Sequence, residues 1–444
     1  MRLIDGADAA RRTILSRRPA QRSDLPQTMR ERLAEVFGEP LTAEQATRRI
    51  LDDVAAEGDA AVKRYNAAFD GQEDGCLELT SAEREEGAEE VPPELRKALE
   101  FAASRIREYH EEQREHAARD FFRAGRGQKV TAIERAGIYV PGTNVVYPSS
   151  VLMTAIPARV AGVREILMAT SVGAGGRVSP LKLLAAQLAG VDRIFRMSGA
   201  QAIAALAFGT QSVPQVDKIY GPGGLFVTIA KRMVYGQVGV DSIYGPSETI
   251  VIVDDNADPV LAAADLIAQA EHDELANPIL LATSTKVARR ILDEVERQLG
   301  TLPRADVART AFKNHGGAAV VGSIEEAIDL ANEYAPEHLC LNVEDADRYV
   351  GLVRNAGAIF VGEGSPEAIG DYTAGPSHVM PTGRAARFSG ALGVHDFLKV
   401  TTVVQLDAAL AAELAQHGAV IAHAEGFAGH AAAMERRLPE GPDK

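Results

Sequence analysis

The chain has 444 residues, of which 46% are hydrophobic and 25% charged, and its formal net charge at pH 7 is −15. A chain of this length and average globular composition is expected to form two or three domains. The acidity and the lack of a basic tract argue against nucleic acid or an anionic membrane as a partner, and the sequence contains neither a membrane-spanning apolar run nor a signal-peptide core. We therefore expect a cytoplasmic enzyme that acts on small molecules.

The first third of the chain is predicted to be helical. From Glu31 to about Glu115, apolar residues recur at the i, i+3, i+4 and i+7 spacing of amphipathic helices, and Pro92-Pro93 stands just before one of them. The outer faces are charged and carry no convincing cluster of reactive residues. This stretch is interpreted as scaffold.

Near Ala136 the pattern changes to short β-rich runs that alternate with turns and with helices rich in Ala and Leu. This alternation is typical of parallel sheets covered by helices. After about Leu392 the chain becomes a helical tail. The sequence predicts an α/β fold with two Rossmann-like open parallel-sheet domains and with helical N-terminal and C-terminal extensions. Because ligands in such sheets bind at the carboxyl ends of the strands, we expect the functional residues there.

Two glycine-rich turns are candidate cofactor loops. Gly173-Ala-Gly-Gly-Arg-Val has Val178 where a dinucleotide fingerprint has its third glycine, and Gly221-Pro-Gly-Gly matches neither that fingerprint nor a Walker loop. Each fits an ordinary turn between a strand and a helix, although the second could let a nucleotide approach the backbone at a helix start. Neither turn proves a cofactor.

Two clusters contain residue types that bind metal ions. Gln269 and His272 are i, i+3 neighbours near the end of a helical run, so their side chains leave one face of the helix together. Taken alone, this pair also fits a polar helix end. The loop from Gly370 to His378 carries Asp371 among glycines and prolines, and such a loop is a candidate for function.

Two further clusters carry acidic residues and histidines. Glu337 and His338 are adjacent and precede an apolar run, and the ordinary pKa of histidine suits proton transfer near neutral pH. A salt bridge at a helix end is the alternative for this pair. Glu425 and His430 lie in the tail, where they could equally belong to a solvated helix.

Together these clusters predict a metal site with nitrogen and oxygen ligands. The only cysteines, Cys76 and Cys340, lie far apart in the sequence and exclude a thiolate zinc cluster. The remaining donor types suit a dication such as Zn²⁺ and leave the adjacent Glu-His pair free as acid and base. The candidate ligands are Gln269, His272, Asp371 and His430.

Several stretches occur in an order that resembles a known family over nearly the whole chain. They are Gly137-Ile-Tyr-Val-Pro-Gly, Tyr147-Pro-Ser-Ser-Val-Leu-Met, Gly199-Ala-Gln-Ala-Ile-Ala-Ala-Leu-Ala, Val216-Asp-Lys-Ile, Gly245-Pro-Ser-Glu, Gln269-Ala-Glu-His, Ala335-Pro-Glu-His-Leu, Gly370-Asp-Tyr and Ala424-Glu-Gly. With these motifs the chain resembles histidinol dehydrogenase, an enzyme that carries out the last two oxidations of histidine biosynthesis.

The resemblance implies a role for each candidate residue. It implies one Zn²⁺ per subunit, with the last of its ligands supplied by the partner subunit of a homodimer with shared active sites. It implies His338 as the general base and Glu337 as the activator of water. The substrate, L-histidinol, would be held by the metal ligands Gln269, His272, Asp371 and His430 together with Ser247, His338, His378 and Glu425. The cofactor, NAD, would meet Tyr139, Gln201 and Gly224.

The resemblance also suggests a division into domains. It comprises an N-terminal helical extension (1–30), a metal-bearing catalytic domain (31–135 with 248–392), a cofactor-binding domain (136–247) and a helical tail (393–444) that contributes to the partner subunit's site. L-Histidinol would be oxidised through L-histidinaldehyde to L-histidine, with the aldehyde retained between the two steps.

Three departures from the family pattern lie in the expected cofactor domain. Gly224 stands where an asparagine is expected, Ser198 replaces a glycine, and Val172-Gly-Ala-Gly-Gly replaces a proline-rich turn. They bear on cofactor geometry more than on the metal or the catalytic pair.

Two alternatives remain at this point. One is a relative with the same metal site that oxidises another small polyol or amino alcohol, for example a sulfonated diol. Ser247, His378 and Glu425, which would contact the imidazole end of the substrate, favour histidinol. The other is a catalytically inactive binding or regulatory protein, which the intact Glu337-His338 pair disfavours.

Overall fold

The computed structural model describes residues 2–17, 25–72, 75–142 and 146–438. The chain forms two compact units: Met1–Glu115 with Ile133–Phe397, and His116–Ala132 with Leu398–Lys444. In the described part of the chain, no helix is both long and apolar enough to cross a membrane.

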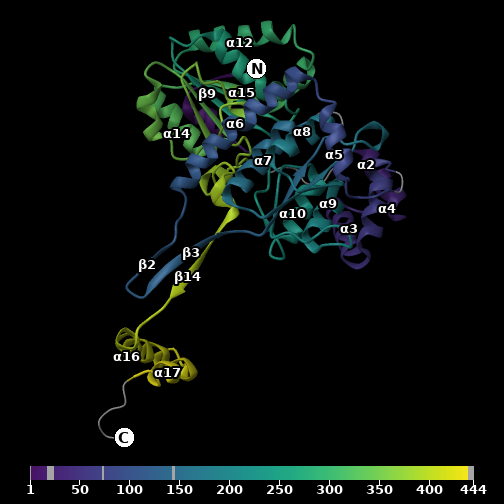
Figure 1. Ribbon diagram of the computed structural model, residues 1–444. Helices are drawn as coiled ribbons and strands as arrows, with labels where there is room; N and C mark the ends of the chain where they lie inside the picture. Colours follow the sequence, from purple (N-terminus) through teal and green to yellow (C-terminus); the bar gives the residue numbers. More distant parts are fainter. Residues whose placement is uncertain (1, 18–24, 73–74, 143–145, 439–444) are drawn as a thin grey trace. The chain divides into compact units, whose positions relative to one another are not determined.

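The first unit contains a parallel six-stranded sheet with helices on both faces (Figure 1). Along its strand β9, Ile250 and Ile252 face one helix layer, whereas Val251 and Val253 face the other. Because both faces are buried, the strand appears in the sequence as a continuous apolar run. In spatial order the strands are β1 (Leu3–Asp5), β11 (Gly317–Val320), β10 (Asn277–Ala282), β9 (Glu248–Val253), β12 (His338–Asn342) and β13 (Ala358–Val361). The covering helices are α11 (Pro259–Ala270), α12 (Thr285–Leu299) and α13 (Ala305–Asn314) on one face, and α1 (Ala7–Arg12) and α14 (Ile324–Tyr334) on the other.

A second, five-stranded parallel sheet lies in the same unit. Its spatial order is β6 (Arg193–Arg196), β5 (Glu165–Thr170), β4 (Arg135–Val140), β7 (Lys218–Tyr220) and β8 (Gly239–Val240). Its connecting helices are α7 (Pro148–Ala161), α8 (Pro180–Ala189), α9 (Gly199–Phe208) and α10 (Leu225–Val234). Counted along the chain, this order is 3-2-1-4-5, as in dinucleotide-binding folds. The predicted α/β class with two open parallel sheets is confirmed.

The N-terminal part differs in two respects from the sequence-based expectation. Residues 1–30 were expected to form a helical extension, but Leu3–Asp5 forms strand β1 at the edge of the six-stranded sheet. Residues 1 and 18–24 of this range lie outside the described residues. Three residues are too short to show a periodic pattern. The sequence-based division places residues 31–135 in the metal-bearing domain. In the structure, three helices of this stretch pack beside the five-stranded sheet instead: α3 against α9 and α10, α4 against α9, and α5 against α8. The helices of this stretch are α2 (Gln27–Phe37), α3 (Ala43–Glu57), α4 (Asp59–Asp70), α5 (Ser81–Glu89) and α6 (Pro93–His116).

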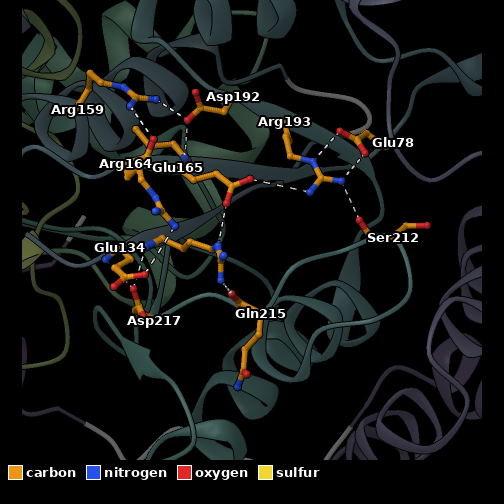
Figure 2. Close-up of polar contacts among 12 residues, drawn as sticks. Glu78, Glu134, Arg159, Arg164, Glu165, Asp192, Arg193, Ser212, Gln215 and Asp217 are labelled. Carbon is orange, nitrogen blue, oxygen red and sulfur yellow. Dashed lines mark hydrogen bonds and ion pairs between the residues drawn. The ribbon is translucent and has the colours of Figure 1, made fainter.

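Charged side chains connect the amino ends of the five-stranded sheet (Figure 2). Arg135, which begins β4, pairs with Glu165 of β5 at 2.8 Å, and Arg193 of β6 pairs with Glu78 at 2.5 Å. Asp217 accepts hydrogen bonds from the backbone N–H groups of Glu134 and Arg135 at 2.7 and 2.8 Å. These contacts hold the amino ends of the neighbouring strands together.

The second unit combines an antiparallel ribbon with two helices. Its elements are β2 (Phe121–Arg123), β3 (Arg126–Ala132), β14 (Leu398–Val404), α16 (Ala408–Ala424) and α17 (Ala428–Glu435) (Figure 1). The tail was expected to be helical from residue 393, so β14 corrects that expectation; residues 439–444 lie outside the described part. The run Val400-Thr-Thr-Val-Val is rich in β-branched residues, which favour strands. Val404, Ile421 and Phe427 are exposed on this unit.

Candidate functional site

The predicted acid–base pair lies at the amino edge of the six-stranded sheet. His338 is the first residue of β12, Glu337 precedes it, and Glu248 is the first residue of the neighbouring strand β9. The expectation that these residues lie at the carboxyl ends of strands is therefore wrong for this sheet. The reason is topological: helices that connect parallel strands run back along the sheet, so their C-terminal ends meet the amino ends of the strands.

Three of the four predicted metal ligands belong to this region. Gln269 is buried on the last turn of α11, and its Nε2 donates to Oδ2 of Asp371 at 3.4 Å. Asp371 lies on the short helix α15 (Glu367–Tyr372). His272 follows α11, and its side chain is exposed. The neutral imidazole is the form that binds a metal ion.

The chemistry of these three side chains fits a borderline dication. An amide, a neutral imidazole and a carboxylate provide the nitrogen and oxygen donors that Zn²⁺ accepts. Within residues 2–17, 25–72, 75–142 and 146–438, however, no group of three or more His, Cys, Asp or Glu side chains is placed to hold a metal ion. A site built on Gln269, His272 and Asp371 would need a further donor.

The contacts of His338 indicate which ring nitrogen can accept a proton. Its Nδ1 lies 3.3 Å from the carbonyl oxygen of Glu248, which can only accept a hydrogen bond. Nδ1 therefore carries the hydrogen in this contact, and Nε2 is the free base of the neutral ring. Among the described residues, buried Nε2 has no hydrogen-bond partner, and it lies 3.8 Å from Oδ1 of Asp371. This nitrogen is available to a substrate.

Glu337 is held beside this ring by the same strand. Its Oε2 accepts the backbone N–H of Glu248 at 3.1 Å and lies 3.7 Å from Nδ1 of His338. Burial raises the pKa of Glu337, which keeps the carboxyl close to the protonation state needed for proton transfer near neutral pH. Burial would lower the pKa of His338, but the Glu337 charge and the contact with Asp371 outweigh it and raise that pKa. In the ligand-free protein the ring therefore holds a second proton near neutral pH, and it must release this proton before Nε2 can act as a base. The arrangement suits a coupled acid–base pair.

Sequence reasoning missed the residues that support this pair. Both polar atoms of the Glu248 backbone contact the pair, and its buried side chain forms an ion pair with both Nη atoms of Arg17. The guanidinium of Arg17 also stacks 3.9 Å from the ring centroid of Tyr334. In the sequence, Glu248 appears only as the last residue of the motif Gly245-Pro-Ser-Glu. Arg17 belongs to no motif, and its partner is 231 residues away.

A second buried carboxyl lies behind Asp371. Glu367 begins α15, one helical turn before Asp371, and it is fully buried. Its Oε2 accepts a hydrogen bond from Thr249 at 2.9 Å, and among the described residues its Oε1 has no partner. Burial raises the pKa of Glu367 to about 8, so the carboxyl is mostly neutral near pH 7.

His378 connects the two sheets of the first unit. Its Nδ1 lies 2.8 Å from the Asp371 carbonyl oxygen, so it donates there, and its Nε2 lies 3.2 Å from Oγ of Ser150. Ser150 is in the first turn of α7, which follows β4 at the carboxyl edge of the five-stranded sheet. The predicted substrate residue Ser247 immediately precedes β9 and is half-buried. The structure therefore brings His378 and Ser247 to the same edge as the acid–base pair.

The predicted cofactor residues lie at the carboxyl edge of the five-stranded sheet, as expected. Tyr139, near the end of β4, accepts the Gly199 backbone N–H at 3.2 Å, and buried Gln201 donates to Asn66 at 3.2 Å. Gly221 follows β7 with φ +111°, and a Cβ there would lie 2.2 Å from the Tyr139 carbonyl oxygen, so only glycine fits. At Gly224 a Cβ would meet nothing within 4 Å, which leaves open space at the start of α10.

The last two predicted site residues belong to the second unit. Glu425 caps the C-terminal end of α16, and His430 lies on α17 with its ring 5.3 Å from that of Phe427. Both side chains are exposed on that unit.

Comparison with known proteins shows the family to which the chain is similar. A sequence profile described as histidinol dehydrogenase matches residues 38–438. A curated histidinol dehydrogenase from Dehalococcoides mccartyi is 47% identical over 99% of this chain and 100% of its own length. That of Thermus thermophilus is 49% identical over 89% of this chain and 95% of its own. A crystal structure of histidinol dehydrogenase from Elizabethkingia anophelis superposes with a TM-score of 0.89 at 32% identity, covering 98% of each chain.

Proposed function

The chain belongs to the histidinol dehydrogenase family, and on this premise we propose that it oxidises L-histidinol through L-histidinaldehyde to L-histidine with NAD and Zn²⁺. The observation that carries the proposal is the Glu337-His338 pair, buried beside Gln269 and Asp371 at one edge of the sheet. The alternative, oxidation of another polyol or amino alcohol, has less support because the similar proteins are histidinol dehydrogenases.

His338 is proposed to act as the general base of the first oxidation. Its Nε2 would accept the proton of the substrate hydroxyl while Nδ1 stays bonded to the Glu248 carbonyl. The fixed Nδ1 contact keeps the ring in one tautomer and one orientation. When bound, NAD⁺ supplies the oxidant by accepting a hydride in each step.

Glu337 is proposed to activate water in the second oxidation. Its raised pKa makes the carboxyl a competent base near neutral pH, and the Glu248 N–H orients one of its oxygens. Water added to the aldehyde gives a hydrate, and His338 can remove a proton from it once the proton of the first step has been released to solvent. The two adjacent residues thus have separate tasks. Both are positioned by the backbone of the same residue, Glu248.

We assign substrate and metal binding to the residues around this pair. Zn²⁺, when bound, supplies a Lewis acid that holds the imidazole and amine of the substrate. Ser247 and His378 are assigned to the substrate as well, and Glu425, which lies in the same tail as His430, is assigned to the substrate in the partner subunit's site. Membership of the family supports assigning the remaining ligand to His430 of the partner subunit in a cytoplasmic homodimer. The ligands from this chain would be Gln269, His272 and Asp371.

The apolar residues Val404, Ile421 and Phe427 are exposed on the second unit, and a subunit interface at this unit would bury such side chains. The dinucleotide is assigned to the carboxyl edge of the five-stranded sheet, at Tyr139, Gln201 and the backbone near Gly224. The domain division of the sequence analysis stays a proposal with the corrections given above.

The stoichiometry of the reaction tests the function. The zinc-loaded protein is incubated with L-histidinol and excess NAD⁺, and NADH and the amino-acid product are quantified. About two NADH per histidinol, with histidine as product, is expected from two successive hydride transfers. No turnover of histidinol by a folded, zinc-loaded protein that oxidises another amino alcohol or diol would overturn the proposal.

A further inference from the structure

A large cavity lies over the second and third strands of the five-stranded sheet. Its volume is about 1550 Å³, above the ~300–1,000 Å³ of ordinary small-molecule pockets. Gly173, which follows β5, and Arg196, which ends β6, contribute to its wall. In a sheet of order 3-2-1-4-5, a dinucleotide crosses the carboxyl ends of the strands, with its adenosine half over the second strand. The cavity lies where that half is expected.

The end of β5 lacks the acidic residue that usually binds a ribose in this fold. Such a carboxylate ordinarily follows the second strand and accepts a hydrogen bond from the ribose 2′-hydroxyl. Here β5 is followed by Ser171, Val172 and Gly173, none of which is acidic. A carboxylate reaches the cavity from elsewhere in the fold.

That carboxylate belongs to Asp70, the last residue of α4, which lines the cavity. Ser198 lies between β6 and α9, and its Oγ donates to Oδ2 of Asp70 at 2.7 Å. Among the described residues this hydroxyl is the one side-chain donor to Asp70, so Oδ1 is available to a ligand. Asp70 is thus held in position by a neutral group, the Ser198 hydroxyl.

The other charged groups of the cavity wall are already engaged. Arg196 pairs with Glu83, Arg64 with Glu57, and Arg177 with Glu90. Asp59 is bound by the hydroxyls of Thr210 and Ser212. Lys63 also has a partner. Among the described residues, the wall therefore offers no free cluster of cations that would attract an additional phosphate.

A hydrogen bond joins the cavity wall to one of the residues assigned to the nicotinamide half. Asn66 lines the cavity one helical turn before Asp70, and its Oδ1 accepts a hydrogen bond from Gln201 at 3.2 Å. The side-chain amide of Asn66 also donates to the Arg196 carbonyl at 2.9 Å. Gln201 is thus hydrogen-bonded to the same helix, α4, that carries Asp70.

We propose that Asp70, positioned by Ser198, is the residue that selects NAD over NADP by binding the adenosine ribose hydroxyls and repelling a 2′-phosphate. This inference rests on the proposed function, since it assumes a dinucleotide at this sheet. Asp70 would thus determine specificity from a helix of the N-terminal scaffold, and not from the sheet itself.

Nucleotide binding tests the inference without any need for turnover. Dissociation constants for NADH and NADPH are measured by fluorescence titration of the full-length protein and of Asp70→Ser. Loss of a hydrogen bond to a charged group should weaken NADH binding by about 10-fold to 100-fold. NADPH binding should stay equal or tighten, because the repelling charge is gone. The preference for NADH over NADPH should therefore fall by at least about 10-fold.

Further variants separate this role from a structural one. Asp70→Asn keeps the volume and removes the charge, so it should lower the preference even if Asp70→Ser folds poorly. Asp52→Ser, on the exposed face of α3, is the matched control and should change neither constant. If the parent protein binds NADH and both Asp70 variants keep its preference, the inference is wrong while the proposed function stands. If the parent protein binds neither nucleotide, both fail together.

Discussion

Nε2 of His338 lies 3.8 Å from Oδ1 of Asp371, at the start of β12 and on α15 respectively. This relationship places a proton acceptor next to a predicted metal ligand, so that a substrate bound through one would reach the other. In the sequence, neither residue reveals its role by itself. The two come close only because the folded sheet and helix bring distant parts of the chain together.

Glu337→Gln should impair the second oxidation more than the first. The amide has nearly the shape of the carboxyl group, and its oxygen can still accept the Glu248 N–H, but it cannot take a proton from water. We expect a loss of about 10²-fold to 10⁴-fold in oxidation of L-histidinaldehyde, typical of a missing general base, and a much smaller loss in single-turnover oxidation of L-histidinol. Glu296→Gln, exposed on α12, is the control. Equal losses in both steps would remove the role assigned to Glu337.

Mixed dimers test whether His430 serves the partner subunit's site. His338→Asn and His430→Ala each inactivate their own homodimers in this scheme. If His430 of the partner subunit completes the metal site, a heterodimer of the two variants has one intact site, and an equal mixture should recover about a quarter of the parent activity.

The same experiment has a clear negative outcome. If His430 acted within its own chain, both sites of the heterodimer would be defective and no activity would return. His423→Ala changes a histidine that pairs with Glu435 in the same unit at 2.8 Å, and it should leave the zinc content unchanged. His430→Ala should lower that content.

Lys182 should make stability rise with pH above about 8. Its ammonium group is buried and hydrogen-bonded to Thr170 and to the Gly142 carbonyl, and burial lowers its pKa from 10.5 to about 8. Between these values the unfolded chain binds more protons than the folded one, so the free energy of unfolding increases with pH. The full shift corresponds to about 3 kcal/mol.

A buried methionine separates this effect from other titrations. Urea unfolding of the parent protein and of Lys182→Met is compared at pH 7.5 and pH 10. The parent should gain stability relative to the variant as the pH rises. A constant difference would show that the lysine has an ordinary pKa.

Arg17→Met should destabilise the protein and reduce catalysis together. It leaves the buried Glu248 carboxylate without its cation, which is expected to cost about 3–5 kcal/mol. Because the Glu248 backbone holds Glu337 and His338, kcat should fall as well. In the double variant with Glu248→Gln the uncompensated charge is absent, so part of the stability should return. Additive losses in a double-mutant cycle would contradict a coupled pair.

Much of the molecule could be predicted from the sequence because the signal is local. The strands of both parallel sheets appear as continuous apolar runs, since neighbours such as Ile250 and Val251 are buried on opposite faces. The i, i+3 spacing of Gln269 and His272 indicates a shared helix face, and the adjacent residues Glu337 and His338 suggest acid–base chemistry. These features depend on residues close together in the chain.

Long-range packing decided the rest. The sequence could not place the acid–base pair at the amino edge of its sheet, because strand order and helix direction arise only when distant segments pair. It could not identify Arg17 or Asp70, whose partners Glu248 and Ser198 are 231 and 128 residues away. A side chain's chemistry is fixed by its type, but its pKa and its ligand depend on burial and neighbours, and these exist only in the folded structure.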